Sequence, residues 1–215
     1  MSKPQSKILI KWTPEFAYII GLITTDGSLS SDKRHINFTS KDKELVLKFK
    51  KILKLTNKIG KKSRDGNKIK KYFVIQFGDV NFYKFLLSIG LMPAKTKILK
   101  SLKIPKRYFF DFLRGHFDGD GSFYSYWDKR WKSSFMFYTT FCSASKNHII
   151  WLKKMLLKIL KIKGHITHPK FKSTYQLKYA KKESIFLIKR LYYSPKVICL
   201  KRKHLKIFKI LDNIN

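Results

Sequence analysis

Apolar and polar residues in the first half of the chain change spacing several times. Residues 14–26 are largely apolar, which predicts a buried helix. Residues 28–40 and 59–78 alternate between apolar and polar side chains, and this period of two predicts two half-buried β-hairpins. Residues 42–55 and 81–89 carry apolar residues at helical spacing, which predicts helices that close one side of a sheet.

The first helix has clear signals at both ends. Thr13 is a good N-cap, and Pro14 suits the first helical position because it has no N–H to satisfy there. Gly27 can adopt the left-handed conformation that often ends a helix. We therefore expect a helix from residue 14 to residue 26.

The second half of the chain repeats this order. Aligning Gly21 with Gly115 gives an offset of 94 residues, which also superposes Asp26-Gly27 on Asp120-Gly121. The later hairpins match at offsets of 103 and 102, so the hairpin at 122–142 is nine residues longer than its counterpart, around Trp127 to Lys132. A final basic helix is expected at about 201–212.

These patterns predict an α+β fold made of two pseudo-symmetric αββαββα repeats. Residues 1–100 would hold the first repeat with its linker, and residues 101–215 the second. Small residues at four-residue spacing, among them Ala17, Gly21 and Gly115, would let the two leading helices pack closely against each other.

Asp26 and Asp120 would then come together at the C-terminal ends of these helices. A carboxylate is unfavourable at the negative end of a helix dipole, and a second carboxylate beside it adds repulsion. Oxygen ligands of this kind suit a hard divalent cation, and Mg²⁺ is the usual one where phosphates are the other ligands. Asp118 lies about 200° around the helix from Asp120, so we assign it no metal role.

At these residues the chain resembles the LAGLIDADG homing endonucleases in their single-chain form with two motifs. The nine residues Ile19-Ile20-Gly21-Leu22-Ile23-Thr24-Thr25-Asp26-Gly27 and Leu113-Arg114-Gly115-His116-Phe117-Asp118-Gly119-Asp120-Gly121 align with the family signature without gaps. The match departs at Thr24, where the family often has an acid, and at Arg114 and His116, which are polar within the helix.

The resemblance implies paired LAGLIDADG helices at the interface, a DNA-binding β-saddle and metal-dependent cleavage of double-stranded DNA. It further implies that Asp26 and Asp120 are catalytic metal ligands, helped by the main-chain carbonyls of Thr25 and Gly119. Family members also keep a basic residue near each scissile phosphate, and the matching positions here are Lys95 and Lys201.

Each predicted sheet has one polar face. A two-stranded ribbon fits the major groove, where alternate side chains can contact base edges. The outward residues, which we expect to contact DNA, are Ser28, Ser30, His35, Asn37, Thr39, Val74 and Gln76 in the first repeat, and Ser122, Tyr124, Tyr126, Tyr138, Thr140, Gln176 and Lys178 in the second.

Composition supports a nucleic-acid partner. The 215 residues carry a formal net charge of +35, and the positive charges are dispersed among the 44% of residues that are hydrophobic, as in a folded basic protein. No apolar run is long enough to span a membrane, and no signal peptide is evident. Cys142 and Cys199 are isolated in sequence, so we expect small buried residues in a reducing intracellular compartment that holds the genome.

Three functional classes fit the sequence. The first is a monomeric endonuclease that makes a staggered double-strand break at a long target site and promotes homing of an intron or intein. The second is a maturase that binds intron RNA on the same scaffold, and the third is a DNA-binding regulator without catalysis. Retention of both Asp26 and Asp120 favours the endonuclease, because neither other class needs the two carboxylates.

Overall fold

A computed structural model describes residues 7–63, 71–131, 133–170 and 173–212. The chain divides into two compact units. Unit 1 comprises Met1–Lys95 and Leu102–Gly115, and unit 2 comprises Thr96–Ser101 and His116–Asn215. The division at residue 100 that the sequence suggests concerns the repeats rather than these units, and it stays a prediction.

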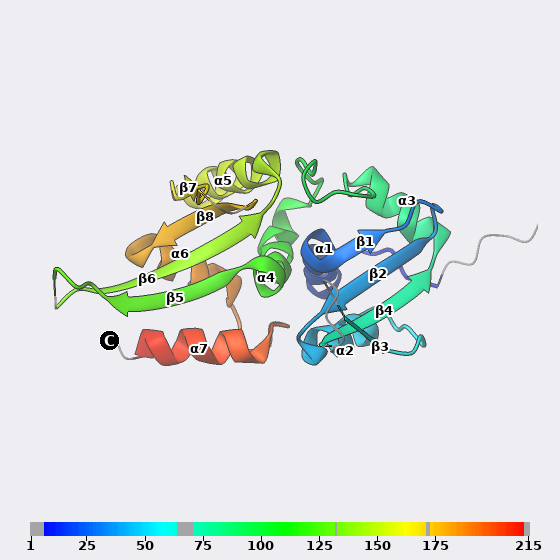
Figure 1. Ribbon diagram of the computed structural model, residues 1–215, viewed down its shortest axis with the longest axis horizontal. Coiled ribbons are helices and arrows are strands. Elements are labelled where there is room, and N and C mark those ends of the chain that lie inside the picture. Colours follow the sequence, from blue (N-terminus) through cyan, green and yellow to red (C-terminus); the bar gives the residue numbers. More distant parts are fainter. Residues whose placement is uncertain (1–6, 64–70, 132, 171–172, 213–215) are drawn as a thin grey trace, which may run out of the picture. The chain divides into compact units, whose positions relative to one another are not determined.

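Unit 1 contains a four-stranded antiparallel sheet in the order β1-β2-β4-β3 (Figure 1). The strands β2 and β4 form its centre, where Ile36 pairs with Phe77 and Phe38 with Ile75. The turn between β3 and β4, predicted at Asp65-Gly66, lies outside the described residues. The elements in chain order are α1 (Pro14–Asp26), β1 (Gly27–Leu29), β2 (His35–Ser40), α2 (Lys43–Ile52), β3 (Gly60–Lys62), β4 (Tyr72–Gly78) and α3 (Val80–Ser88).

Helices pack on one face of this sheet because alternate strand residues are apolar. The ring of Phe38 stacks on Phe49 of α2 at a centroid distance of 4.5 Å, and Phe77 lies 6.1 Å from the same ring. Asp79 caps α3 by accepting the Phe82 N–H at 2.8 Å, and it also accepts the Ile8 N–H at 2.9 Å. This carboxylate therefore ties the N-terminal segment to the unit.

Unit 2 repeats the arrangement with the sheet order β5-β6-β8-β7. The strand β6 occupies the centre, pairing with β5 through Ser122 and Thr140 and with β8 through Phe141 and Leu177. The elements in chain order are η1 (Lys106–Tyr108), α4 (Phe109–Asp120), β5 (Ser122–Trp127), β6 (Phe135–Ser143), α5 (Lys146–Leu160), β7 (His165–Thr167), β8 (Tyr175–Ala180), α6 (Lys181–Leu191) and α7 (Lys201–Asp212), of which η1 and the first part of α4 belong to unit 1.

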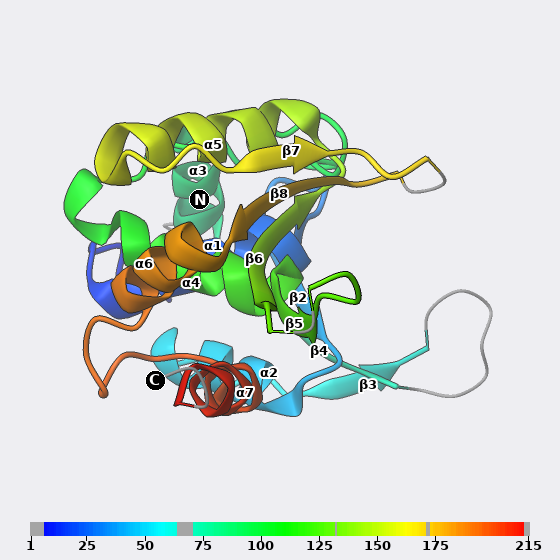
Figure 2. The same cartoon turned by 90° about the vertical axis from the view of Figure 1, so that its left-hand side faces the viewer.

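The helices α5 and α6 cover the apolar face of the second sheet (Figure 2). Ser145 caps α5 by accepting the His148 N–H at 3.4 Å, and its hydroxyl donates to the Leu99 carbonyl. A hydrogen bond of 2.5 Å joins the hydroxyls of Thr139 in β6 and Ser184 in α6, both of which are buried. These bonds satisfy polar groups that the core would otherwise leave without partners.

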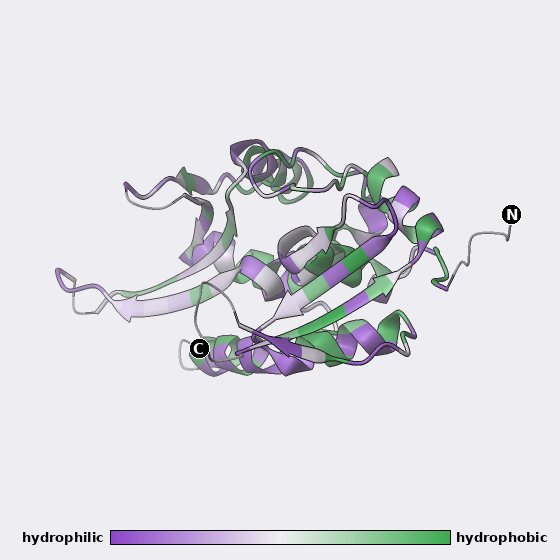
Figure 3. Ribbon diagram, turned by 45° about the vertical axis from the view of Figure 1, so that its right-hand side comes forward, coloured by the Kyte–Doolittle hydropathy of each residue, from purple (hydrophilic) through white to green (hydrophobic). Residues whose placement is uncertain are grey.

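The α+β prediction with two repeats of helices and a four-stranded sheet is confirmed. The second repeat nevertheless holds one helix more than the sequence analysis expected. The helix α6 follows the second hairpin, as α3 does in the first repeat, and α7 comes after it without a counterpart. We missed α6 because it begins directly after β8, with no intervening turn, and its apolar residues form one short run, Ile185 to Ile188, between basic residues. Figure 3 shows α7 with both hydrophilic and hydrophobic segments.

The burial of the two cysteines also differs from expectation. Cys142 and Cys199 are half-buried rather than buried. None of the helices in the described ranges is long and apolar enough to cross a membrane.

Candidate functional site

The first LAGLIDADG-like helix, α1, starts at the predicted residues. Thr13 Oγ1 accepts the Phe16 N–H at 3.1 Å, and Pro14 occupies the first turn. The helix ends at Asp26, after which Gly27 begins β1 directly.

Gly27 does not adopt the left-handed conformation that we predicted. Its φ of −87° and ψ of 153° are extended, because the chain passes straight from the helix into a strand. Glycine is required for a different reason. An added Cβ would lie 2.7 Å from both Cα and O of Ile23, so the packing of the strand start on the helix leaves no room for a side chain.

The second copy has the same local construction. The helix α4 ends at Asp120, and a Cβ at Gly121 would lie 2.6 Å from the carbonyl oxygen of Phe117. Asp26 is half-buried and Asp120 is exposed, so each carboxylate has access to solvent. Each helix therefore presents a terminal carboxylate on a turn that packing constrains.

A lysine distant in sequence reaches the end of each helix. Lys95 is 7% exposed, and its ammonium donates to the carbonyl of Gly27. In unit 2, Lys203 donates to the carbonyls of Phe117 at 2.6 Å, Asp118 at 2.9 Å and Gly121 at 2.7 Å.

Lys203, rather than Lys201, is the counterpart of Lys95. Gly27 and Gly121 are equivalent in the repeat, and it is Lys203 that donates to the carbonyl of Gly121. Both candidate lysines lie in the first turn of α7, where residues two apart point about 200° away from each other. Lys201 is exposed.

These lysines change the electrostatic argument made from sequence. Neither α1 nor α4 has a basic residue in its last turn, which is why the carboxylates at their ends called for a cation. Lys95 and Lys203 place an ammonium group against the last carbonyls of each helix and offset part of the negative end of its dipole. A metal ion is thus not the only positive charge available there.

Asp118 has a structural role. Its side chain is buried, and Oδ2 accepts the N–H of Leu200 at 2.7 Å, immediately before α7 begins. The carboxylate therefore fixes the position at which α7 starts, and through it the position of Lys203.

The groups proposed as metal ligands fit a hard cation in their chemistry. The carboxylates of Asp26 and Asp120 and the carbonyls of Thr25 and Gly119 are all oxygen donors at helix ends. Gly119 is not among the three residues whose carbonyls accept from Lys203. Within the described ranges, no three or more His, Cys, Asp or Glu residues group together as a metal site. Binding of Mg²⁺ at these helix ends stays a prediction.

The α1 helix and the first part of α4 pack closely within unit 1. A Cβ at Gly115 would lie 2.0 Å from the carbonyl oxygen of Tyr18 and 3.1 Å from Cα of Gly21. Ala17 of α1 is fully buried. Arg114 is buried as well, paired with Asp111 at 2.7 Å, so the polar residue that departs from the family signature is neutralised within its own helix.

The open face of the first sheet carries the predicted polar residues. Ser28 pairs with Asn37, and Asn37 pairs with Gln76 across three strands, so these side chains share one face. Ser28 and Gln76 are exposed, whereas the other members are half-buried, namely Ser30, His35, Asn37, Thr39 and Val74.

His35 is held on this face by a residue that the sequence analysis did not select. Its Nδ1 is hydrogen-bonded to Asp32, which also accepts the N–H groups of Arg34 at 3.1 Å and His35 at 3.0 Å. These bonds, the imidazole first, lower the pKa of the Asp32 carboxyl to about 2. The Ser-Asp turn was visible in the sequence, and an aspartate that accepts from the residues following it is a common turn motif.

The open face of the second sheet is aromatic. Tyr124 and Tyr138 face each other across β5 and β6, and Tyr126 stacks beside Tyr138. A hydrogen bond with Tyr126, together with burial, raises the pKa of the Tyr138 hydroxyl to about 12. Thr140 is only 2% exposed, so its contact with DNA stays a prediction that the burial of its side chain does not favour.

Thr140 is covered because it lies in a central strand, between Ser122 on β5 and Lys178 on β8, and its side chain is short. The remaining predicted residues of this face are accessible. Ser122 is exposed, and Gln176 and Lys178 are half-buried.

Comparison with known proteins agrees with this construction. Residues 13–90 match the family described as the LAGLIDADG-like domain. No curated protein sequence matches the chain.

Several solved structures share the fold. The I-LtrWI LAGLIDADG homing endonuclease bound to target DNA has a TM-score of 0.62 at 14% identity, over 94% of this chain and 90% of its own. I-SmaMI, bound to uncleaved DNA target in the presence of calcium ions, has a TM-score of 0.59 at 16% identity, over 95% of this chain and 93% of its own. Full-length DUF199/WhiA from Thermatoga maritima has a TM-score of 0.57 at 18% identity, over 96% of this chain and 63% of its own.

The fold and the repeated helix ends define an α+β protein with two repeats of the LAGLIDADG type. The chain contains a LAGLIDADG-like domain at residues 13–90, and as a whole it has the fold of the single-chain LAGLIDADG homing endonucleases. The resemblance found in the sequence is thereby confirmed. The same fold occurs in DUF199/WhiA, which is not named as an endonuclease, so the activity is a separate question.

Proposed function

We propose that the chain is a metal-dependent, sequence-specific DNA endonuclease. It makes a staggered double-strand break at a long target site and thereby promotes homing of an intron or intein. The observation that carries this proposal is the repeated helix end. In both repeats a terminal aspartate precedes a glycine that packing requires, and a lysine donates to the carbonyl of that glycine.

Asp26 and Asp120 are the catalytic metal ligands in this proposal, with the carbonyls of Thr25 and Gly119 as further oxygen ligands. Mg²⁺ bound there would supply the Lewis-acid chemistry for hydrolysis of a phosphodiester. The protein contributes carboxylates whose backbone is fixed by close packing. Such fixed groups need little reorganisation when charge develops in the reaction.

Lys95 and Lys203 position these helix ends. Each ammonium donates to the carbonyl of the glycine that follows the aspartate, and Lys203 also donates to the carbonyls of Phe117 and Asp118. Both lysines add positive potential beside the site where a phosphate backbone would lie. Lys201, exposed on the first turn of α7, is available for phosphate contact.

The two sheets are the proposed DNA-binding surfaces. Half-exposed polar residues on a twisted antiparallel sheet suit contacts to base edges in the major groove, while the many lysines suit phosphates. The similar proteins I-LtrWI and I-GzeII were solved with their DNA targets, which supports a DNA partner here. Two repeats in one chain would let a monomer cut both strands, in whichever compartment holds the genome.

A DNA-binding protein without nuclease activity is the second candidate, because DUF199/WhiA shares the fold over 96% of this chain. The third class from the sequence analysis, an intron RNA maturase, would bind a folded intron RNA as tightly as duplex DNA or more tightly. Both alternatives predict that the terminal carboxylates can be replaced without loss of function.

The deciding experiment removes these carboxylates. The wild-type protein is incubated with a randomised plasmid library and Mg²⁺, and the cut ends are sequenced to find the target. The Asp26→Asn and Asp120→Asn double variant should bind this target in a gel-shift assay without metal but should not cut it. Asparagine keeps the shape of aspartate but is a poor ligand for Mg²⁺ beside a carboxylate.

Glu15→Gln in the first turn of α1 serves as the matched control, because it removes one carboxylate from the same helix at its other end. It should cut like the wild type. Full cleavage by the double variant would overturn the assignment of both aspartates. Absence of cleavage by the wild type at a site that it binds would favour the non-catalytic candidate.

A further inference from the structure

The β5–β6 hairpin is a long two-stranded ribbon (Figure 1). Its strands pair continuously from Ser122–Thr140 to Trp127–Phe135, six residue pairs in all. In the first repeat the corresponding hairpin of β1 and β2 forms three pairs. The additional residues in the second repeat therefore build a feature that its counterpart lacks.

The open face of this ribbon presents stacked rings. The centroids of Tyr124 and Tyr138 lie 5.1 Å apart with an interplanar angle of 18°, and those of Tyr126 and Tyr138 lie 6.1 Å apart at 11°. The strand β5 is coloured pale in Figure 3, as expected for tyrosine, serine and tryptophan, which are neither strongly hydrophilic nor strongly hydrophobic. The equivalent face of the first sheet holds Ser28, Asn37 and Gln76 instead.

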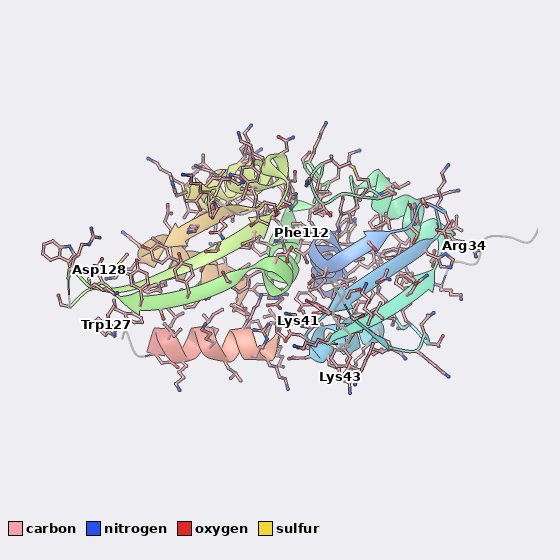
Figure 4. The ribbon with its side chains drawn as sticks, viewed as in Figure 1. Arg34, Lys41, Lys43, Phe112, Trp127 and Asp128 are labelled. Atoms are coloured by element: carbon pink, nitrogen blue, oxygen red, sulfur yellow. The ribbon has the colours of Figure 1, made fainter. Side chains whose placement is uncertain are left out.

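Two tryptophans lie at the tip of the ribbon with much of their surface exposed. Trp127 is 61% exposed and Trp131 is 69% exposed. Figure 4 shows Trp127 and Asp128 at this end of the hairpin. Trp127 rests against Phe135 at a centroid distance of 4.9 Å, which leaves one side of its ring accessible.

The turn that carries these tryptophans is hydrogen-bonded. Asp128 accepts the Arg130 N–H at 2.9 Å, the Asp128 N–H donates to Ser134, and the Ser134 N–H donates to the Trp131 carbonyl at 2.7 Å. Lys129 and Arg130 are exposed between the two tryptophans. The tip thus carries two cations between two aromatic rings.

We propose that this ribbon binds unpaired nucleobases by stacking them on its aromatic rings, an inference that rests on the proposed nucleic-acid partner. In a duplex, neighbouring base pairs cover the faces of each base, and the grooves present only its edges. Exposed indole and phenol rings have most to gain from bases whose faces are free, as in single strands or at an opened step.

The cations at the tip indicate that the planar partner is also anionic. Lys129 and Arg130 lie between the two tryptophans in the sequence, and Arg130 is paired with Asp128 at 3.4 Å. The net charge of +35 favours a polyanion over an uncharged partner. Aromatic rings interleaved with positive charge are the usual construction of surfaces that bind single strands without sequence preference.

The test uses tryptophan fluorescence in the full chain. Trp12→Phe and Trp151→Phe are introduced as the background, so that the emission reports only Trp127 and Trp131. Titration with an oligothymidylate should quench this emission through stacking, and the duplex of that strand with oligoadenylate should quench it much less. Trp131→Ala should weaken oligothymidylate binding by about 5- to 150-fold, and Trp131→Phe should restore most of the affinity.

The salt dependence of binding distinguishes the contribution of stacking from that of electrostatic attraction. The Trp131→Ala variant should keep the wild-type slope of log affinity against log salt. Lys129→Gln should reduce the magnitude of this slope by about 1, because about one counterion fewer is released on binding. Tyr193→Ala is the matched control, because Tyr193 is an aromatic residue of unit 2 that is 53% exposed outside the ribbon. It should bind oligothymidylate like the parent.

The inference would be overturned if oligothymidylate left the emission unchanged and Trp131→Ala bound it as tightly as the parent does. Duplex binding and cleavage would in that case leave the proposed function standing. Equal quenching by the duplex would also overturn the inference, as would quenching by anionic phosphatidylserine vesicles in place of the oligonucleotide. Failure to bind any nucleic acid would refute the proposed function together with this inference.

Discussion

Replacing Gly115 with alanine should destabilise the contact between α4 and α1. The added Cβ would lie 2.0 Å from the carbonyl oxygen and 2.9 Å from the carbonyl carbon of Tyr18, and 3.1 Å from Cα of Gly21. All three atoms belong to the backbone of one helix, so no side-chain rotation can relieve the clash. The helices must separate, and the apolar contacts on both sides of Gly115 must loosen with them.

The expected loss of stability follows from two opposing effects. Overpacking of a close contact costs about 1–3 kcal/mol, and the upper end applies here because the obstacle is backbone. Alanine in a helix is favoured over glycine by about 1 kcal/mol. The net destabilisation is therefore about 2 kcal/mol, which lowers the melting temperature by about 4–8 °C in a protein of this size.

Thermal unfolding followed by far-UV circular dichroism measures this change. Gly60→Ala is the matched control, because the nearest atom to its added Cβ is the side-chain Cγ1 of Val74 at 3.3 Å, on an exposed edge strand. It should melt within experimental error of the wild type. If Gly115→Ala melted no lower than Gly60→Ala, the two helices would not be packed along this stripe.

Three further predictions concern the helix ends and the DNA-binding surface. Lys203→Met should reduce cleavage much more than Lys201→Met, because Lys203 contacts three carbonyls at the end of α4; equal losses in a plasmid cleavage assay would contradict this assignment. If the two sheets together contact about ten phosphates, log affinity for duplex DNA should fall with log salt at a slope of about −9, and a slope near zero would exclude duplex binding. Carbon-detected NMR should show the Asp32 carboxyl titrating with a pKa of about 2, and in His35→Ala this pKa should move towards 3.8. Because the pKa is lower in the folded state, the interaction stabilises the fold above the unfolded pKa and is lost as the pH falls through about 2. An unchanged pKa in His35→Ala would show that the imidazole is not the main partner of Asp32.

The local pattern of the sequence determined most of the fold. The bounds of α1 and α7 and the order of hairpins follow from apolar spacing, caps and turn residues, which act over a few positions. The repeat at an offset of 94 residues identified Asp26-Gly27 and Asp120-Gly121 as equivalent helix ends. These features are visible in a sequence because each depends on neighbours along the chain.

Tertiary structure decided the features that depend on distant segments. Lys203 rather than Lys201 reaches the end of α4, because Asp118 fixes where α7 begins and the helix turns one of the two lysines inward. Gly27 is needed for space instead of for a left-handed turn, since β1 starts directly against Ile23. Periodicity assigns a residue to a face, but the contacts that cover that face come from segments far away along the chain.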